Sequence, residues 1–314
     1  MQQTTPPIRI GTRGSPLAIA QTEEVKRRLC DAHPHLAADP GQVQVEVIKT
    51  TGDNVQDRAL AEIGGKALFT KEIDEALLDG RIDMAVHSMK DVPTYLPDGM
   101  VMPAILERED PRDVFICLTA NSFAELPEGA LVGTSSLRRQ AQVLARRPDL
   151  QVTLFRGNVQ TRLRKLKEGV ADATMLALAG LNRMDMADVA TAVLAPEEML
   201  PAVGQGAVGV ASRAGDEAAE TLLAPLHHRL THDRVMAERA FLRMLDGSCR
   251  TPIAALALPE GENGLWLRGL LASEDGTRLY ETQRHAPRGD AEAMGEDAGR
   301  EVRAAARTAD LPGQ

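Results

Sequence analysis

Between residues 131 and 183 the sequence repeats one pattern three times: a short apolar run, a turn, and a helical stretch. The apolar runs begin at Leu131, Val152 and Ala173. A strand, a helix and a further strand in succession place both strands parallel in one sheet, with a right-handed crossover. We therefore predict a parallel sheet in this part of the chain, with the turns of all three units at the same edge.

Polar and cationic residues collect at that predicted edge. The first unit supplies Thr134, Ser135, Ser136, Arg138 and Arg139, and the second supplies Arg156, Gly157, Asn158 and Arg162. Helix N-termini favour anions, and arginines that face one edge repel each other unless they bind carboxylates or phosphates. The set predicts an anion site, although any one arginine could instead lie on a solvated helix face.

A second polar stretch, residues 87–93, follows the apolar run 82–86 and predicts a buried strand that runs into a loop. Ligands bind beyond the carboxyl ends of strands in open α/β sheets. Ser88, Lys90 and Asp91 arrive together at such a place. A carboxylate beside an ammonium can act as acid, base or charge stabiliser. The alternative is a loop with a solvated Lys–Asp pair.

Two more cations lie next to predicted helix starts. Arg13 stands in the turn after the predicted strand 8–10, and Ser15 is a good N-cap for the helix that follows. Lys66 follows two glycines before the predicted helix 67–78. Both positions favour an anion. An arginine that is only solvated is the alternative for Arg13.

Two polar or glycine-punctuated crossings predict the domain organisation. Residues 107–111 and 201–206 would be hinges in a body of two lobes with a cleft, and Gln205 could donate a hydrogen bond into that cleft. We expect domain 1 at 7–106 and 207–225, domain 2 at 112–200, and domain 3 at 229–314. The fold class would be α/β, with mixed, mainly parallel sheets in the two lobes.

The last part of the chain has a different pattern. A helix over 233–245 precedes three expected antiparallel strands, at 253–258, 265–271 and 277–282, joined by turns that contain Gly264 and Gly276. A helical tail follows from about residue 290. These elements predict a small α+β domain with a three-stranded antiparallel sheet.

Composition excludes several classes of protein. A net charge of −9 and an aromatic content of 3% argue against nucleic-acid binding. No apolar run approaches the ~20 residues of a membrane span, and no signal pattern is visible at the N-terminus. The three cysteines are widely spaced, which fits a reducing compartment. We expect a soluble, cytoplasmic protein without a metal site.

Cys249 is the cysteine with possible chemistry. It follows a glycine in a predicted loop and precedes Arg250, and exposure beside a cation lowers the pKa of a thiol. It could be a nucleophile or an attachment point, or a buried inert thiol, which is the commoner case.

Several of these motifs, in this order, resemble the porphobilinogen deaminase (hydroxymethylbilane synthase) family. They are HSMKDVP at 87–93, EDPRD at 109–113, GTSSLRR at 133–139, RGN at 156–158, AVGQG at 202–206, and Cys249. The resemblance covers nearly the whole chain. It implies two lobes like those of periplasmic binding proteins and a third domain that carries the cofactor.

The resemblance also implies the chemistry. Four porphobilinogen molecules lose ammonia and join head to tail into the linear tetrapyrrole hydroxymethylbilane, in tetrapyrrole (haem-type) biosynthesis. The primer is a dipyrromethane cofactor, held by a thioether to Cys249. Asp91 would hydrogen-bond pyrrole N–H groups and stabilise the cation that forms when ammonia leaves. The protein would be a monomer with a small-molecule substrate and no nucleic-acid or membrane partner.

The family pattern assigns the remaining residues. Arg183 and Gln205 would lie near the incoming substrate. Separately from the family pattern, the composition of residues 54–62 suggests a lid over the cleft. Carboxylates of cofactor or substrate would be held by Arg13, Lys66, Ser88, Lys90, Ser135, Arg138, Arg139, Arg156 and Arg162. The rival hypothesis is a two-lobed carboxylate-binding protein without catalysis, which has no use for a loop cysteine on an added domain.

The attachment of the cofactor predicts a mass difference. The purified protein is expected to be heavier than its sequence by a two-pyrrole adduct, and the Cys249→Ala variant to have the bare sequence mass, because the variant lacks the sulfur that forms the thioether. Intact mass spectrometry of both proteins measures this. A bare wild-type mass that stays unchanged after porphobilinogen is added would contradict the thiol attachment.

Overall fold

The computed structural model describes residues 6–54, 68–245, 247 and 251–308. The chain divides into two compact units. Among the described residues, unit 1 holds 6–54, 68–108 and 207–231, and unit 2 holds 109–206 together with the described residues from 232 onward. Each unit is described by itself.

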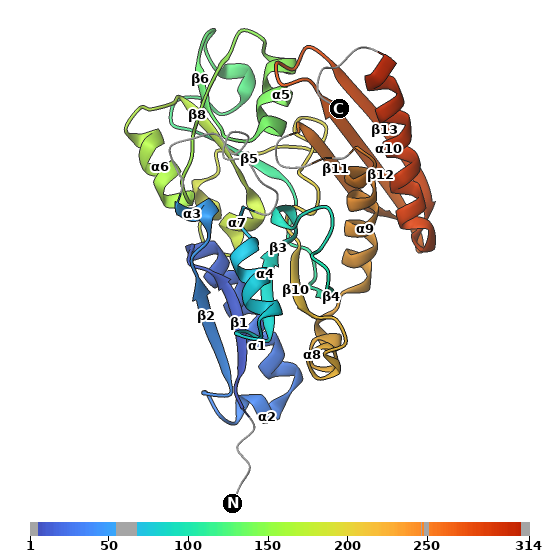
Figure 1. The fold of residues 1–314 in the computed structure, drawn as a ribbon. Helices are drawn as coiled ribbons and strands as arrows, with labels where there is room; N and C mark the ends of the chain where they lie inside the picture. The colour runs from blue at the N-terminus through green and yellow to red at the C-terminus, as the bar shows by residue number, and fades with distance from the viewer. Residues whose placement is uncertain (1–5, 55–67, 246, 248–250, 309–314) are drawn as a thin grey trace, which may run out of the picture. The chain divides into compact units, whose positions relative to one another are not determined.

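Unit 1 is built on a five-stranded sheet in the order β2-β1-β3-β10-β4 (Figure 1). Its strands are β1 (Ile8–Arg13), β2 (Val43–Ile48), β3 (Met84–Ser88), β4 (Met100–Ile105) and β10 (Val208–Arg213). Its helices are α1 (Pro16–Ala32), α2 (Pro34–Ala37), α3 (Thr51–Asn54), α4 (Lys71–Leu78) and α8 (Glu217–Leu223), with 3-10 turns η1 (Met89–Asp91) and η4 (Ala224–Leu226). The pairs β1–β2 and β1–β3 are parallel, and β10 runs antiparallel to both of its neighbours.

Helices cover both faces of this sheet, so β3 is buried on both sides. Met84 and Val86 belong to the core that includes Val25 and Leu29 of α1. Ala85 belongs to the opposite core, with Ile73 and Leu77 of α4. Successive side chains of a strand point to opposite faces, which explains why this strand is apolar throughout rather than alternating.

Unit 2 contains a second five-stranded sheet in the order β7-β6-β8-β5-β9. Its strands are β5 (Asp113–Cys117), β6 (Leu131–Gly133), β7 (Gln151–Thr153), β8 (Ala173–Ala177) and β9 (Ala192–Val193). Helices α5 (Leu137–Arg146), α6 (Val159–Lys167) and α7 (Leu178–Asn182) follow β6, β7 and β8, and η2 (Phe123–Glu125) and η3 (Ala187–Val189) lie in connections. The parallel pairing of β6 with β7 and β8, predicted from the repeated pattern, is confirmed.

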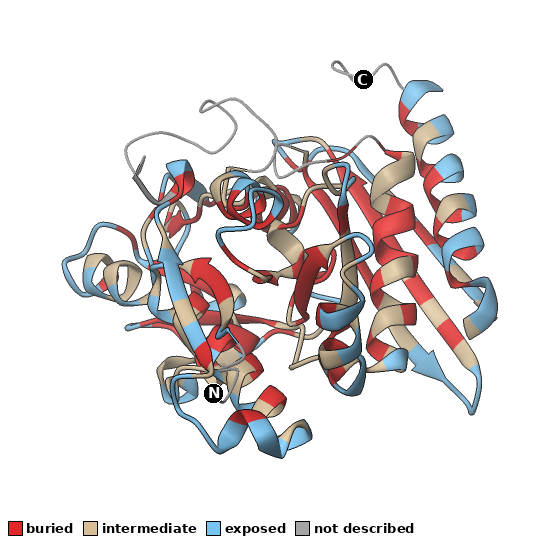
Figure 2. Ribbon diagram, turned by 60° about the horizontal axis from the view of Figure 1, so that its bottom comes forward, coloured by how far each residue is buried: buried red, intermediate tan, exposed pale blue. Residues whose placement is uncertain are grey.

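The second part of unit 2 is a helix pair on a three-stranded sheet. Strands β11 (Ile253–Glu260), β12 (Gly264–Ala272) and β13 (Leu279–Pro287) are antiparallel in sequence order. Helix α9 (Arg229–Met244) precedes them, and η5 (Arg288–Asp290) and α10 (Ala291–Thr308) follow. Figure 2 shows the buried side of these helices in red. On α10 that side carries Met294, Ala298 and Val302.

The predicted fold class is confirmed. Both five-stranded sheets are mixed, as expected, because β10 in unit 1 and β5 in unit 2 run antiparallel to their neighbours. The three-stranded antiparallel sheet is also confirmed, although its last strand, expected at 277–282, is β13. The division into three domains stays a prediction. In the described part of the chain no helix is long and apolar enough to cross a membrane.

Several boundaries differ from the sequence predictions: the helix expected at 67–78 is α4 and begins at Lys71, the helix expected at 233–245 is α9 and begins at Arg229, and two strand ends near the candidate site also differ. The first strand was expected to end at residue 10 and continues to Arg13, which is therefore a strand-end residue rather than a turn residue. The strand expected at 82–86 is β3, so His87 and Ser88 lie in the strand and not in the loop. Pairing with β10 reaches Ser88 and explains the second shift.

Close helix packing predicts a stability effect at Gly295. A Cβ there would meet the Ala237 carbonyl oxygen and the Ala240 side chain of α9. Gly295→Ala is expected to lower the free energy of unfolding by about 1–3 kcal/mol, because the clash outweighs the better helix propensity of alanine. Urea unfolding measures it. Gly289→Ala, where no atom lies within 4 Å of a new Cβ, is the control. Equal midpoints for the two variants would contradict this packing.

Candidate active site

In unit 1, two parallel strands bring Arg13 and Asp91 together. Strands β1 and β3 pair side by side, so their carboxyl ends lie at one edge of the sheet. Arg13 ends β1, and Asp91 lies in η1, directly after β3. An Arg13 Nη1 atom is 3.5 Å from Asp91 Oδ2, with both side chains partly exposed. The guanidinium also lies 4.2 Å from the ring centre of Phe69. The pair leaves a carboxylate accessible at a strand end.

The residues around this pair have distinct roles. Ser88 Oγ and the Gln21 amide of α1 exchange hydrogen bonds at 2.9 and 3.1 Å. Lys90 is half-buried within η1. Ser15 caps α1 as predicted, since its Oγ accepts from the Ala18 N–H at 3.3 Å. The hydroxyls of Ser15 and Ser88 therefore hold local structure.

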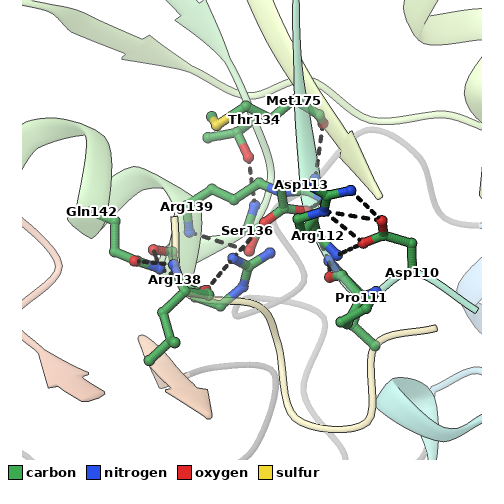
Figure 3. A network of polar contacts seen from close by, with 12 residues as sticks. Asp110, Pro111, Arg112, Asp113, Thr134, Ser136, Arg138, Arg139, Gln142 and Met175 are labelled. Atoms are coloured by element: carbon green, nitrogen blue, oxygen red, sulfur yellow. Dashed lines mark hydrogen bonds and ion pairs between the residues drawn. The ribbon is translucent and has the colours of Figure 1, made fainter. Parts of the chain in front are cut away.

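In unit 2, the buried carboxylate of Asp113 binds Arg138 and Arg139 (Figure 3). Each arginine donates to a different oxygen of Asp113 at 2.7 Å. Arg138 also donates to the Leu200 carbonyl at 2.7 Å, and Arg139 to the Met175 carbonyl at 2.9 Å. Asp113 is 0% exposed and both arginines 6%. Their predicted role toward ligand carboxylates is untested, but a carboxylate of the protein already binds both.

The electrostatics of this cluster follow from burial. Desolvation alone would raise the pKa of Asp113, but the charges and hydrogen bonds of Arg138 and Arg139 hold it far below its usual range. Burial lowers the pKa of Arg138, and the neighbouring Arg139 charge adds to this against the attraction of Asp113. Sequence analysis assigned Asp113 no role, because an aspartate at the start of a strand has no local signal of two distant arginine partners.

A second group of cations lies at the starts of α5 and α6. Arg156 is buried, and Arg162 Nε donates to the Gly157 carbonyl at 2.9 Å. Burial lowers the pKa of Arg162 to about 10, and the charges of Arg139 and Arg156 add to the effect. Ser135 Oγ is buried with no hydrogen-bond partner among the described residues. Crowded cations and an unused hydroxyl fit a ligand that carries carboxylates.

The other predicted residues of this edge build its backbone. Ser136 caps α5 by accepting from the Arg139 N–H at 3.4 Å, and Asn158 caps α6 by accepting from the Thr161 N–H at 2.8 Å. Thr134 Oγ1 accepts from the Ser136 N–H at 3.1 Å. Gly157 has a φ of +124°, which a side chain would disfavour. The sequence analysis placed these residues in turns before helices and did not identify the two caps.

Arg183 and Gln205 belong to the region where the chain crosses between the units. An Arg183 Nη2 atom donates to the Gly206 carbonyl at 3.1 Å. Gln205 Nε2 donates to the Pro111 carbonyl at 2.7 Å and to Asp113 Oδ1 at 3.0 Å. Both side chains therefore hydrogen-bond the 201–206 segment to the rest of unit 2, or bond other parts of unit 2 to it. Their expected place near the substrate stays a prediction.

Some predicted residues lie outside the described part of the chain. They are Lys66, Cys249 and the proposed lid at 54–62 beyond Asn54. Conversely, sequence analysis missed a buried pair in unit 1. His87 Nε2 lies 3.5 Å from Asp74 Oδ1 of α4. The signal that could have found it is an aspartate on the apolar side of a predicted helix. No group of three potential metal ligands occurs among the residues that the structure describes.

The α/β sheets with cations near their strand ends are typical of the class of proteins that bind anionic ligands at strand ends. Two family models match the chain. The porphobilinogen deaminase dipyrromethane cofactor-binding domain matches residues 8–221, and the porphobilinogen deaminase C-terminal domain matches 232–304.

Curated relatives agree with the family models. A chloroplastic porphobilinogen deaminase of Oryza sativa subsp. japonica is 59% identical, over 95% of this chain and 84% of the relative. The porphobilinogen deaminase of Paracoccus denitrificans is 56% identical, over 95% of this chain and 94% of the relative. The chain belongs to the porphobilinogen deaminase family. It is an enzyme of tetrapyrrole biosynthesis with a dipyrromethane cofactor, and the resemblance found in the motifs is confirmed.

Solved structures show a weaker likeness. The methionine-binding protein MetQ gives a TM-score of 0.44 at 13% identity, over 72% of this chain and 89% of that chain. A putative methionine-binding lipoprotein of Bacillus subtilis gives 0.41 at 15% identity, over 72% and 92%. Likenesses at this level carry no conclusion about ligand or activity.

The Asp113 cluster predicts a large effect on stability. Asp113→Asn is expected to lower the free energy of unfolding by about 3–5 kcal/mol, because it leaves two buried guanidinium groups without an anion. Urea unfolding at neutral pH measures this. Asp149→Asn, which removes the charge of a partly exposed partner of Arg147, is the control and should shift the midpoint far less. Equal effects of the two substitutions would contradict the role of Asp113.

The comparison of wild type with Asp113→Asn also predicts a pH dependence of stability. The folded-state pKa of Asp113 is below its unfolded value of about 3.9, so its contribution is fully present above that pH and is lost as the pH falls through the folded value. The difference in stability between wild type and Asp113→Asn should therefore be constant from pH 7 to about pH 5 and shrink below about pH 4. A difference that grows on acidification would show the opposite sign.

Proposed function

We propose that this chain deaminates porphobilinogen and joins four molecules head to tail into hydroxymethylbilane, with Asp91 as its catalytic carboxylate. The observation that carries the assignment is the Arg13–Asp91 pair at the joined ends of β1 and β3, in a chain of the porphobilinogen deaminase family. Each molecule added releases one ammonia, and one water adds to the terminal methylene carbon when the finished tetrapyrrole is released, which gives its hydroxymethyl group.

Asp91 has the position that this reaction needs. Loss of ammonia from porphobilinogen leaves a pyrrole-derived cation, which a fixed carboxylate stabilises. The same carboxylate accepts hydrogen bonds from pyrrole N–H groups and so orients the ring. Arg13, 3.5 Å away and stacked on Phe69, holds Asp91 in place and offers N–H groups to a substrate carboxylate. The side chain of Asp91 is 25% exposed to solvent, so a ligand can reach it.

The substrate's own charge explains the arginines of unit 2. Porphobilinogen carries an acetate and a propionate group, so a growing chain is a polyanion. Arg156 and Arg162, with the Ser135 hydroxyl, would bind carboxylates, because the crowded guanidinium groups lose their mutual repulsion when an anion joins them. In unit 1, Lys90 and Ser88 would do the same.

The cofactor is assigned to Cys249. A thioether from this cysteine would hold the dipyrromethane, and the bound group supplies the primer to which new pyrrole units are added. The match to the cofactor-binding domain model supports the cofactor. The assignment to Cys249 in particular rests on its place in the family motif and on its predicted loop.

The remaining proposals concern the molecule as a whole. We propose a cytoplasmic monomer with no nucleic-acid or membrane partner. The net charge of −9 and the scarcity of aromatic residues support the absence of nucleic acid. We also propose three domains with hinges at 107–111 and 201–206. The change of unit after Arg108 and before Ala207 supports those hinge positions.

The role of Asp91 predicts the behaviour of its conservative variant. Asp91→Glu keeps the charge but moves it by a bond length, so kcat is expected to fall about a hundredfold or more, since a misplaced charge stabilises the cation poorly. Ammonia release and hydroxymethylbilane formation measure this, and intact mass confirms that the cofactor is still attached. Asp98→Glu, an exposed site in the same unit, is the control. Near-normal turnover of Asp91→Glu would exclude the catalytic role.

A further inference from the structure

The last two residues of β3 are held from opposite faces of the sheet. Ser88 faces α1 and exchanges hydrogen bonds with Gln21. His87 faces α4, where its Nε2 lies 3.5 Å from Asp74 Oδ1. The next residue begins η1, which ends at Asp91. The backbone that carries the proposed catalytic carboxylate therefore leaves the sheet from a strand end that is hydrogen-bonded on one face and lies against a buried carboxylate on the other, where His87 Nε2 makes no hydrogen bond among the described residues.

The contact with α4 joins two ionisable groups, His87 and Asp74, in apolar surroundings. His87 is 6% exposed and Asp74 is 5% exposed. Their neighbours on this face are the apolar residues of the core around Ile73, Leu77 and Ala85. A buried carboxylate beside an imidazole costs free energy that two apolar side chains of similar size would not cost. Space filling alone is a poor reason for this pair.

Arg13 connects the pair to the active site. The parallel register aligns Gly11 with Ala85, and two residues further along it brings Arg13 level with His87. The positive charge of Arg13 acts on His87, and its guanidinium also contacts Asp91. The groups therefore form a row from α4 through β3 and β1 to η1: Asp74, His87, Arg13 and Asp91.

We propose that Asp74 and His87 are positioning residues of the reaction, which fix the strand end before η1 and balance the charge of Arg13 beside Asp91. This inference rests on the proposed role of Asp91. The pair would then affect the rate of the reaction and not only the stability of the fold. The enzyme would be fully active only when Asp74 is ionised.

The ionisation of the pair gives the proposal a measurable sign. Burial raises the pKa of Asp74 to about 6, with the charges of Glu72 and Glu75 on α4 adding to it. Burial lowers the pKa of His87 to about 4, with Arg13 of β1 adding to it. At neutral pH Asp74 is therefore ionised and His87 neutral. Acidification through pH 6 protonates Asp74 and removes the negative charge from the row.

The Asp74→Asn substitution should leave stability unchanged or raise it, and should lower activity. Because folding raises the pKa of Asp74, the ionised carboxylate destabilises the folded state at neutral pH. Asp74→Asn is thus expected to unfold at the wild-type temperature or above it. Its kcat is expected to fall about tenfold to a hundredfold, the cost of a displaced reacting group. KM should change little, because the pair touches no substrate.

The experiment compares three variants with wild type by kcat and KM from pH 5 to 8, by thermal midpoint, and by intact mass for cofactor content. Wild type should lose kcat as the pH falls through about 6, and Asp74→Asn should lack that limb. Asp79→Asn, exposed at the end of the same helix, is the matched control and should behave as wild type. The double variant Asp74→Leu with His87→Phe replaces the pair by apolar groups of similar size.

The double variant decides between positioning and packing. If it folds with its cofactor attached and loses kcat as Asp74→Asn does, the proposal holds. If either variant folds and keeps the wild-type kcat and pH profile, the pair only fills space and the proposal is overturned. Wild type without hydroxymethylbilane formation would instead overturn the proposed function itself, so the two failures are distinct.

Discussion

The carboxylate of Asp113, buried between two arginines, is the interaction on which the rest of unit 2 depends. Asp113 begins β5, Arg138 and Arg139 begin α5, and the Gln205 amide comes from the segment before β10. A buried charge is tolerated only when its partners are in place. The network therefore fixes one strand, one helix and one crossing segment relative to each other, and the anion-binding turns of β6 and β7 rest on this base.

Unit 1 holds Asp91, the proposed catalytic carboxylate, by different means. The strand end of β3 is hydrogen-bonded to Gln21 on one face and lies against Asp74 on the other, and Asp91 follows within one short turn. Arg13, on the neighbouring strand, supplies the counter-charge. A group placed on a rigid strand end needs little reorganisation in the transition state, which is the condition under which a single carboxylate stabilises a cation strongly.

Unit 2 collects positive charge locally within an acidic protein. The chain carries a net charge of −9. Arg139 and Arg156 nevertheless lie close enough to Arg162 to add to the lowering of its pKa by burial. Asp113 neutralises part of this positive charge within the protein. The proposed substrate, a small molecule with carboxylates, fits this local positive charge, and the acidic remainder of the surface repels larger polyanions.

The sequence by itself determined the local elements and one of their caps. Apolar runs predicted β2, β6 and β8, and the hydroxyl of Ser15 predicted the cap of α1, because these features depend on residues within one turn of each other. Only the tertiary structure decided that Asp113 meets Arg138 and Arg139, that His87 lies in a strand against Asp74, and that β5 and β10 run against their neighbours. Those outcomes depend on contacts between residues far apart in the chain, whose free energy is set by burial and has no local signature in the sequence.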